Sequence, residues 1–201
     1  MLDTEIKERM TEKINLRTGV IFMIIALAAM SRFFPMNNFS PIAALGLFGG
    51  AYLSKKWLAF LLPMASILIS DIILNNTVYA HMNEGFTLFY EGWAWQYATY
   101  TLIILLGILV LNKQVSAFKV TGSALFASAL FFLLSNFGTW ASGVIYPMNL
   151  GGLAACYAAG VPFLKGTVMG DLFYSGVLFG GFHLLQMKFG ILKLDPVRVR
   201  R

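Results

Sequence analysis

The sequence predicts an all-α integral membrane protein with six transmembrane helices. Of its 201 residues, 58% are hydrophobic and only 12% are charged. The mean hydropathy is +0.73, and the charged residues lie in groups between long apolar runs instead of recurring along helix faces. A soluble domain of this size could not bury so much apolar surface, so we expect the chain to lie in a lipid bilayer.

The N-terminal segment, residues 1–15, differs from the rest of the chain. Ile6, Met10 and Ile14 fall on one helical stripe, and Glu5 pairs with Arg9 one turn away. This pattern favours an amphipathic helix on the cytoplasmic membrane surface, with a flexible solvated tail as the alternative. We expect residues 16–189 to form the transmembrane domain and residues 190–201 a basic cytoplasmic tail.

Six apolar segments define the expected transmembrane helices. The second is short for a bilayer core that needs about 20 helical residues, although flanking residues could lengthen it. The segments are 16–34, 41–54, 57–74, 94–111, 118–137 and 167–189.

The cationic residues predict how these helices are oriented. Thirteen of the 15 Lys and Arg residues lie at the two termini or in alternate connections: Lys7, Arg9, Lys13, Arg17, Lys55, Lys56, Lys113, Lys119, Lys188, Lys193, Arg198, Arg200 and Arg201. The other connections contain only Arg32 and Lys165. Because cations concentrate on the cytoplasmic side, both termini are expected there, as in a multi-pass protein of a bacterial inner membrane.

The connection between the last two segments contains another apolar stretch, residues 150–164. We expect a short extra helix in this outer loop. The alternative is a seventh span, which would place the Arg-rich C-terminus outside, against the distribution of cations.

Small residues indicate where helices approach closely. Gly46 and Gly50 are four residues apart, as are Gly176 and Gly180. Such strips allow close backbone contact between membrane helices. The alternative is that these glycines make no helix contact, because glycine is common in membrane helices in any case.

Residues 135–171 are unusually rich in polar and helix-disrupting residues for so apolar a chain. Irregular backbone within a membrane persists only where protein covers it or water reaches it. We therefore predict that this stretch forms one wall of a ligand pocket. Its candidate binding residues are Asn136, Trp140, Tyr146, Tyr157 and Asp171.

Three ionisable residues are expected in the outer half of the spans. These are Arg32, Asp71 and Asp171. Ionisable groups in a membrane usually face the bundle interior or a wet cavity. Arg32 could therefore contribute to a shared site, or it could form an ion pair with one aspartate and lock two helices together. Asn38 and Asp71 complete the set of expected binding residues, and Arg32 is a secondary candidate.

The connection over residues 75–92 contains no Lys or Arg but many aromatic residues. A connection of this length is more often a lid or binding loop than filler. His81 and Glu84 are secondary candidates and could ligate a metal on a helix, but an ordinary solvent-facing pair is the simpler interpretation. Whether any metal binds stays open.

The single cysteine, Cys156, cannot form an internal disulfide. It is most simply a small buried hydrophobic residue, and the alternative is a soft ligand for a metal centre such as the cobalt of a corrinoid. No other cofactor is expected. The sequence contains no P-loop, HExxH or GxSxG motif, so we do not expect an enzyme. Basic residues are not interleaved with aromatic ones, which argues against nucleic acid as a partner.

Several motifs resemble an uncharacterised family of small bacterial membrane proteins labelled as transport proteins. The matching residues are Asn38 to Leu45, Phe48 to Leu53, Pro63, Ser70-Asp71, Ser135 to Gly138, Trp140, Tyr146-Pro147, Gly152-Leu153, Ala155 to Tyr157, Pro162-Phe163, Gly170 to Leu172 and Leu178 to Phe182. The resemblance covers about residues 20–185. Two positions depart from related patterns, since Met36 replaces a histidine common in the family and Met30 interrupts the Ala-x-x-x-Ala spacing that begins at Ala26.

The family is more loosely similar to the S components of energy-coupling-factor vitamin transporters. This similarity implies a six-helix bundle that captures a small vitamin-like molecule in an outward-facing pocket, together with an energising membrane module that carries ATPases. A cobalamin-binding relative of S components holds cobalt through a cysteine, which implies a role for Cys156. The alternative function is a scaffold or accessory subunit that binds a protein partner through its outer loops.

Overall fold

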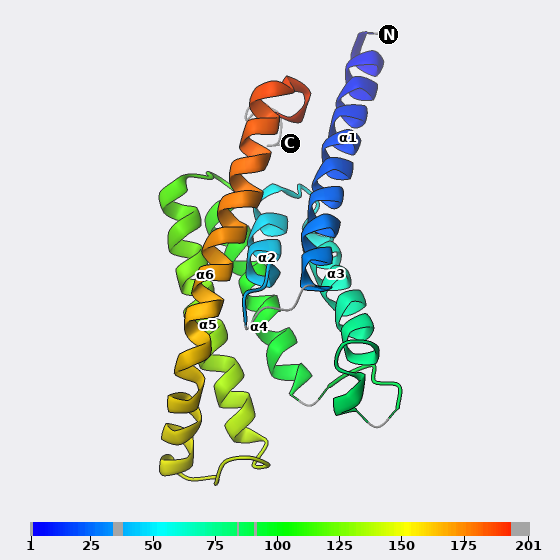
Figure 1. The fold of residues 1–201 in the computed structure, drawn as a ribbon. Helices are drawn as coiled ribbons and strands as arrows, with labels where there is room; N and C mark the ends of the chain where they lie inside the picture. Colours follow the sequence, from blue (N-terminus) through cyan, green and yellow to red (C-terminus); the bar gives the residue numbers. More distant parts are fainter. Residues whose placement is uncertain (1, 34–37, 84, 91, 194–201) are drawn as a thin grey trace.

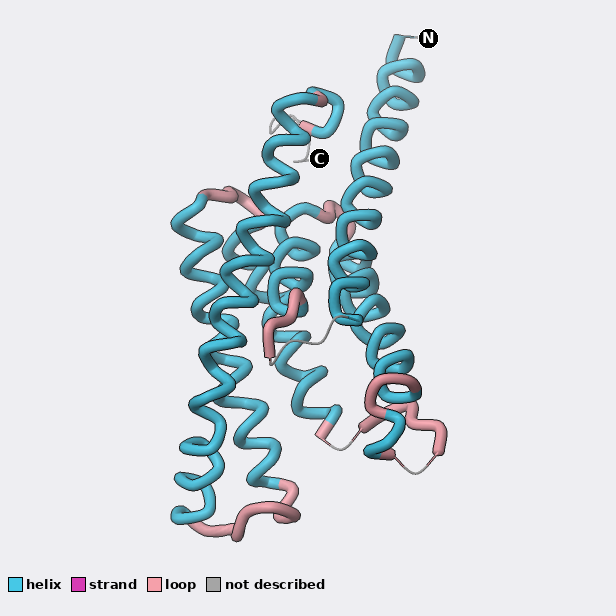
Figure 2. Tube along the Cα trace, viewed as in Figure 1, coloured by secondary structure: helices cyan, strands magenta, loops and turns pink. Residues whose placement is uncertain are grey.

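The computed structural model describes residues 2–33, 38–83, 85–90 and 92–193, and within these ranges the chain is helical without strands. Figures 1 and 2 show a bundle of helices that run roughly along one direction. Its main helices are α1 (Leu2–Met30), α2 (Ile42–Tyr52), α3 (Lys56–Asn76), α4 (Trp93–Leu106), α5 (Ala117–Ala141) and α6 (Leu150–Lys188). A π-helical turn, η3 (Gly107–Leu111), extends α4, and three 3-10 turns, η1 (Ser31–Phe33), η2 (Ala80–Met82) and η4 (Gly190–Leu192), occupy connections.

Among the described residues, five helices are long and apolar enough to cross a membrane. They cover Thr11–Phe33, Lys56–Asn76, Trp93–Leu111, Ala117–Ala141 and Leu150–Lys188. The exception is α2, whose 11 residues extend only about 16 Å, roughly half of a bilayer core. The chain is therefore a multi-pass helical membrane protein with five helices of spanning length and one half-length helix.

The half-length helix begins inside the bundle. In Figure 1, α1 ends partway along the other helices, and α2 starts near this depth and returns toward the end from which α1 came. The start of α1 and the end of α6 lie at that same end of the bundle. The second of the six predicted helices is thus present but too short to span a membrane by itself.

Every residue of α2 from Ala43 to Ala51 is buried, so this helix forms the centre of the core. Gly50 lies against the end of α4: an added Cβ would be 2.7 Å from the Ile104 carbonyl oxygen and 2.8 Å from the Ile108 nitrogen. A Cβ added at Gly107 would come equally close to α2, 2.7 Å from the Leu47 carbonyl oxygen. The prediction of a close helix contact at Gly46 and Gly50 is confirmed.

The second predicted small-residue contact is wrong within this chain. A Cβ added at Gly176 or Gly180 would meet no atom within 4 Å, and both residues are exposed on α6. The glycine spacing is the same in the two pairs. Only the direction in which each strip faces distinguishes them, and the packing of the bundle sets that direction.

A buried arginine closes the other end of α2. Arg17 of α1 is 7% exposed, and its Nη1 donates a hydrogen bond of 2.7 Å to the carbonyl oxygen of Tyr52. The guanidinium carbon lies 5.7 Å from the ring centres of both Tyr52 and Phe182. A cation at a helix C-terminus satisfies free carbonyl groups and complements the helix dipole. Arg17 therefore joins α1, α2 and α6.

The expected short extra helix between the last two spans is a wrong prediction. Residues 150–164 continue without a break into α6, which has 39 residues and includes Pro162. Asn149 begins the helix, because its Oδ1 accepts a hydrogen bond of 2.8 Å from the Gly152 nitrogen. Neighbouring helices compensate for a proline within a membrane helix, and α5 accompanies α6 along this part (Figure 1). Local sequence alone suggested a break that the packing removes.

The N-terminal segment also continues into the first span. Helix α1 runs from Leu2 to Met30 without an interruption near residue 15. The proposed boundary between a surface segment and the transmembrane domain therefore does not coincide with a break in the helix.

We expect Gly50→Ala to lower the stability of the folded protein by about 1–3 kcal/mol, because its methyl group would collide with the backbone of α4 and η3. The matched control is Gly176→Ala, which adds the same methyl group on an open face. Thermal unfolding of the purified variants in detergent measures both effects. Equal melting temperatures for the two variants would contradict the close packing of α2.

Candidate functional site

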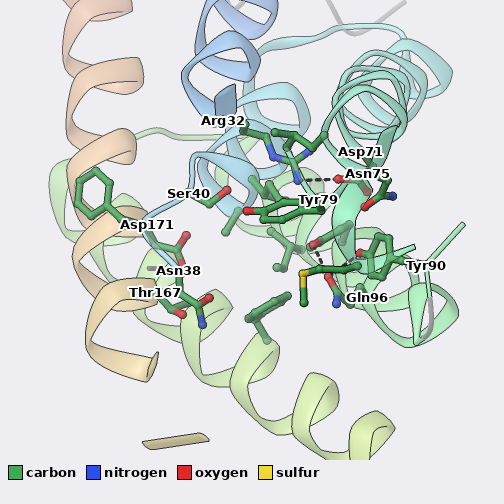
Figure 3. Close-up of a pocket in the computed structure, with 18 of the residues that line it drawn as sticks. Arg32, Asn38, Ser40, Asp71, Asn75, Tyr79, Tyr90, Gln96, Thr167 and Asp171 are labelled. Atoms are coloured by element: carbon green, nitrogen blue, oxygen red, sulfur yellow. Dashed lines mark hydrogen bonds and ion pairs between the residues drawn. The ribbon is translucent and has the colours of Figure 1, made fainter. Parts of the chain in front are cut away.

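A cavity of about 510 Å³ lies between the helices, at the N-terminal end of α2 (Figure 3). Its size is in the range of small-molecule binding sites. Its polar lining consists of Arg32, Asn38, Ser40, Asp71, Asn75, Tyr79, Asn83, Tyr90, Gln96, Tyr100, Thr167 and Asp171. The apolar lining consists of Phe39, Ile42, Ala43, Leu74, Met82, Ile103 and Phe131.

A buried ion pair forms part of the wall. Nη2 of Arg32, in η1, lies 2.6 Å from Oδ1 of Asp71, in α3, and the two side chains are 12% and 5% exposed. Nη1 of Arg32 donates to the Ile67 carbonyl oxygen at 3.2 Å and to the hydroxyl of Ser70. The prediction that Arg32 pairs with one of the two aspartates is confirmed, and both partners also line the cavity.

The second oxygen of Asp71 is also engaged. Oδ2 accepts a hydrogen bond of 2.7 Å from the hydroxyl of Tyr97, in α4. The carboxylate therefore links η1, α3 and α4. A buried charge is tolerated when it is paired and its remaining lone pairs are satisfied, and this pair meets both conditions.

Asp171 has a different environment on the opposite wall. It lies in the middle of α6, is 3% exposed, and its Oδ2 accepts a hydrogen bond of 2.6 Å from the hydroxyl of Ser128, in α5. Among the described residues that line the cavity, Arg32 is the only cationic one, and it is paired with Asp71. Asp171 thus has a hydroxyl partner but no cationic one within that part of the chain.

Two buried polar atoms of the lining have no hydrogen-bond partner among the described residues. They are Oγ of Ser40, just before α2, and Nδ2 of Asn75, one turn beyond Asp71. An unsatisfied buried polar group costs about 1–3 kcal/mol. In a cavity, a ligand or ordered water can supply the missing partner.

The connection between α3 and α4 folds over the cavity. Asn76 binds both backbone groups of Thr87 in this connection, because its Nδ2 donates to the Thr87 carbonyl oxygen and its Oδ1 accepts from the Thr87 nitrogen, each at 2.8 Å. Asn83 Nδ2 donates to the Asn75 carbonyl oxygen at 3.0 Å. These bonds place Tyr79, Asn83 and Tyr90 in the lining (Figure 3).

Gln96 organises two tyrosines of the lining. Its Oε1 accepts hydrogen bonds from the hydroxyls of Tyr90, at 2.7 Å, and Tyr100, at 3.0 Å. Burial raises the pKa of Tyr90 above its ordinary value, so the phenol stays protonated and keeps donating to Gln96. The ring of Tyr100 in turn lies parallel to Phe131, with centroids 6.0 Å apart.

The structure brings together four of the predicted site residues. Arg32, Asn38, Asp71 and Asp171 all line the same cavity, although they come from η1, the turn before α2, α3 and α6. Asp71 and Asp171 are 100 positions apart in the sequence. Asn38 has a positive φ of 53°, a conformation that asparagine tolerates better than most residues.

The other main candidates are not part of this lining. Asn136 Nδ2 donates to the Phe132 carbonyl oxygen at 2.7 Å, and Tyr157 donates to the Leu133 carbonyl oxygen at 2.9 Å. Trp140 Nε1 donates to the Pro147 carbonyl oxygen at 3.0 Å, while Tyr146 lies partly exposed in the connection between α5 and α6. Three of these four side chains satisfy backbone groups of the α5–α6 hairpin.

Cys156 is 2% exposed and packs between the two helices of that hairpin. Its Sγ donates to the Asn136 carbonyl oxygen at 3.2 Å, and the residue is not in the cavity lining. A role for Cys156 as a ligand of a corrinoid cobalt stays a prediction. His81 is exposed in η2, and Glu84 lies outside the described residues. No group of three metal-ligating side chains occurs in the part of the chain that was described.

Sequence reasoning missed several lining residues that helical spacing could have found. Asn75 is one turn after Asp71, and Thr167 is one turn before Asp171, so each shares a helix face with a predicted residue. Gln96 and Tyr100 are likewise four residues apart on α4. Ser40 gave no signal of this kind, because its position depends on where α2 begins.

The fold and the cavity define a multi-pass helical membrane protein with a partly polar internal cavity. The chain belongs to the family of unknown function DUF6580, which it matches over residues 12–194. It has no significant match to a curated protein or to a solved structure.

We expect Asp71→Asn to destabilise the protein by about 3–5 kcal/mol, because it leaves the buried guanidinium of Arg32 without a counter-charge. Glu12→Gln, which removes one negative charge from an exposed position of α1, is the control. Thermal unfolding measures both. The double variant Arg32→Met/Asp71→Leu should lose less stability than Asp71→Asn, and a greater loss would argue against the ion pair as the cause.

Proposed function

We propose that this protein is a membrane transport protein that binds a small, vitamin-like micronutrient in the cavity, in the manner of an S component. The observation that carries the proposal is a ligand-sized cavity with buried polar atoms that lack partners among the described residues. A cavity that served only as a packing defect would be lined by apolar groups.

The position of α2 supports this function. Transporters commonly build their binding sites near the membrane midplane from discontinuous helices, whose ends present free backbone groups to the ligand. Here the first hydrogen bond of α2 runs from the Leu45 nitrogen to the Pro41 carbonyl oxygen. The backbone nitrogens of the first turn, before Leu45, therefore have no carbonyl partner within the helix. Ser40, Ile42 and Ala43 of this region line the cavity.

The proposal includes an orientation. The α2–α3 connection, the connection from η3 to α5 and the end of α6, which contain Lys55, Lys113 and Lys188, lie at the end of the bundle where α1 begins (Figure 1). We place that end at the cytoplasm, which orients the 77–92 connection toward the outside of a bacterial inner membrane. If α1 and the short α2 count as the first two passages, the chain crosses the membrane six times. Uptake would then depend on an energising membrane module with ATPases.

A cavity-filling variant tests ligand binding. We expect the freshly purified protein to show a stoichiometric small-molecule adduct in native mass spectrometry, and Thr167→Phe to lose it, because Thr167 is buried in the cavity wall. Gly176→Phe adds the same ring on the open face of α6 and should retain the adduct. Unfolding curves confirm that both variants are folded. Loss of the adduct in both, or in neither, would contradict binding at this cavity.

The alternative is a scaffold that binds a protein partner, and one surface feature favours it. The tip of the α5–α6 hairpin exposes Val144, Ile145, Met148 and Leu150, which are 61–84% exposed. In Figure 1 this hairpin extends beyond the ends of α3 and α4. A stoichiometric protein subunit in place of a small-molecule adduct in the same spectra would favour the scaffold.

A further inference from the structure

The two carboxylates of the cavity differ in how their charge is balanced. Asp71 is neutralised by Arg32, and both of its oxygens have partners. Asp171 has one hydroxyl partner, Ser128. Because Arg32 supplies the only positive charge in the described lining, the cavity carries one excess carboxylate on the wall formed by α6.

No described cation can reach Asp171 without rearrangement. Arg32 is held by Asp71, by the Ser70 hydroxyl and by the Ile67 carbonyl oxygen. Lys165, the nearest cationic residue along α6, is exposed and is not part of the lining. A buried carboxylate is retained at such a position when a partner compensates its desolvation. A buried carboxylate without a cation takes up a proton instead, and a cationic group in the cavity would supply the partner that keeps Asp171 ionised.

We propose that the ligand carries a cationic nitrogen that pairs with Asp171. This inference rests on the proposed function and narrows it to organic cations, such as amines or protonated nitrogen heterocycles. A metal ion is a poor match, because the described residues provide no cluster of ligating side chains around Asp171. An anionic ligand would add a second unbalanced charge next to the carboxylate.

The aromatic part of the lining fits the same ligand class. Phe39 lines the cavity together with Asp171, and its backbone lies against α6, because a Cβ on Gly170 would be 3.1 Å from the Phe39 Cα. Its ring also contacts Phe173 and Tyr174 of α6, with centroids 5.5 and 5.4 Å away. Tyr100 and Phe131 lie in the wall of the same cavity. Aromatic faces attract organic cations, and the attraction strengthens when both are removed from water.

Three probes of similar shape but different charge test the inference on the full-length protein in detergent: phenethylamine, phenethyl alcohol and hydrocinnamate. We expect phenethylamine to bind roughly ten-fold or more tightly than the other two, because only the amine can form a charge-assisted hydrogen bond with the carboxylate. Asp171→Asn should remove this preference. The amide can still accept from Ser128, so the variant changes the charge and keeps the hydrogen bond.

Glu12→Gln is the matched control, since it removes an exposed carboxylate far along α1 and should leave the preference unchanged. If Asp171→Asn does not fold, Asp171→Glu keeps the charge and should keep the preference. Equal or stronger binding of the alcohol or the acid to the unsubstituted protein overturns the inference, as does a preference for the amine that survives in Asp171→Asn.

The identity of the co-purified molecule separates this inference from the proposed function. A cationic adduct that disappears in Asp171→Asn supports both. A neutral or anionic adduct lost in Thr167→Phe overturns the cationic ligand and leaves the binding function standing. If no adduct is found and none of the three probes binds, both are overturned.

Discussion

The ion pair between Arg32 and Asp71 fixes the place where the chain turns back inside the bundle. Arg32 follows the last turn of α1 and reaches α3, where it meets Asp71 and the Ile67 carbonyl oxygen. Tyr97 adds α4 to the same cluster. In a medium where an unpaired charge is very costly, this cluster restricts how α1, α3 and α4 can be arranged.

The cavity is a consequence of the short α2. This helix occupies the centre of the bundle along part of its length, with Gly50 against α4 at one face and Arg17 closing its C-terminal end. Beyond its N-terminal end the longer helices continue, and their side chains enclose a space of about 510 Å³. A second helix of full length would have filled that space. The 77–92 connection contributes Tyr79 and Tyr90 to the wall of this space.

The hairpin of α5 and α6 shows how similar polar residues acquire different roles. Asn136, Trp140 and Tyr157 resemble ligand-binding residues in the sequence, yet each satisfies a nearby backbone group. Asp171 lies on the same helix as Cys156, but about four turns away, and it reaches the cavity while Cys156 packs against α5. Composition identified the hairpin as unusual. It could not tell which face of α6 turns toward α5 and which toward the centre.

The sequence by itself determined the membrane environment and most of the helices. The apolar segments predicted at 57–74, 94–111 and 118–137 correspond closely to α3, α4 with η3, and α5, because apolar length and the charges at its ends fix where a helix enters and leaves a bilayer. The sequence also indicated Arg32, Asn38, Asp71 and Asp171 as functional candidates, since charged and amide groups are rare in such segments. Only the tertiary structure decided that α6 continues through Pro162, that Arg32 pairs with Asp71 and leaves Asp171 without a cation, and that Asn75 and Gln96 join the cavity. These outcomes depend on the rotation and depth of each helix relative to its neighbours, and contacts between segments distant in the chain set both.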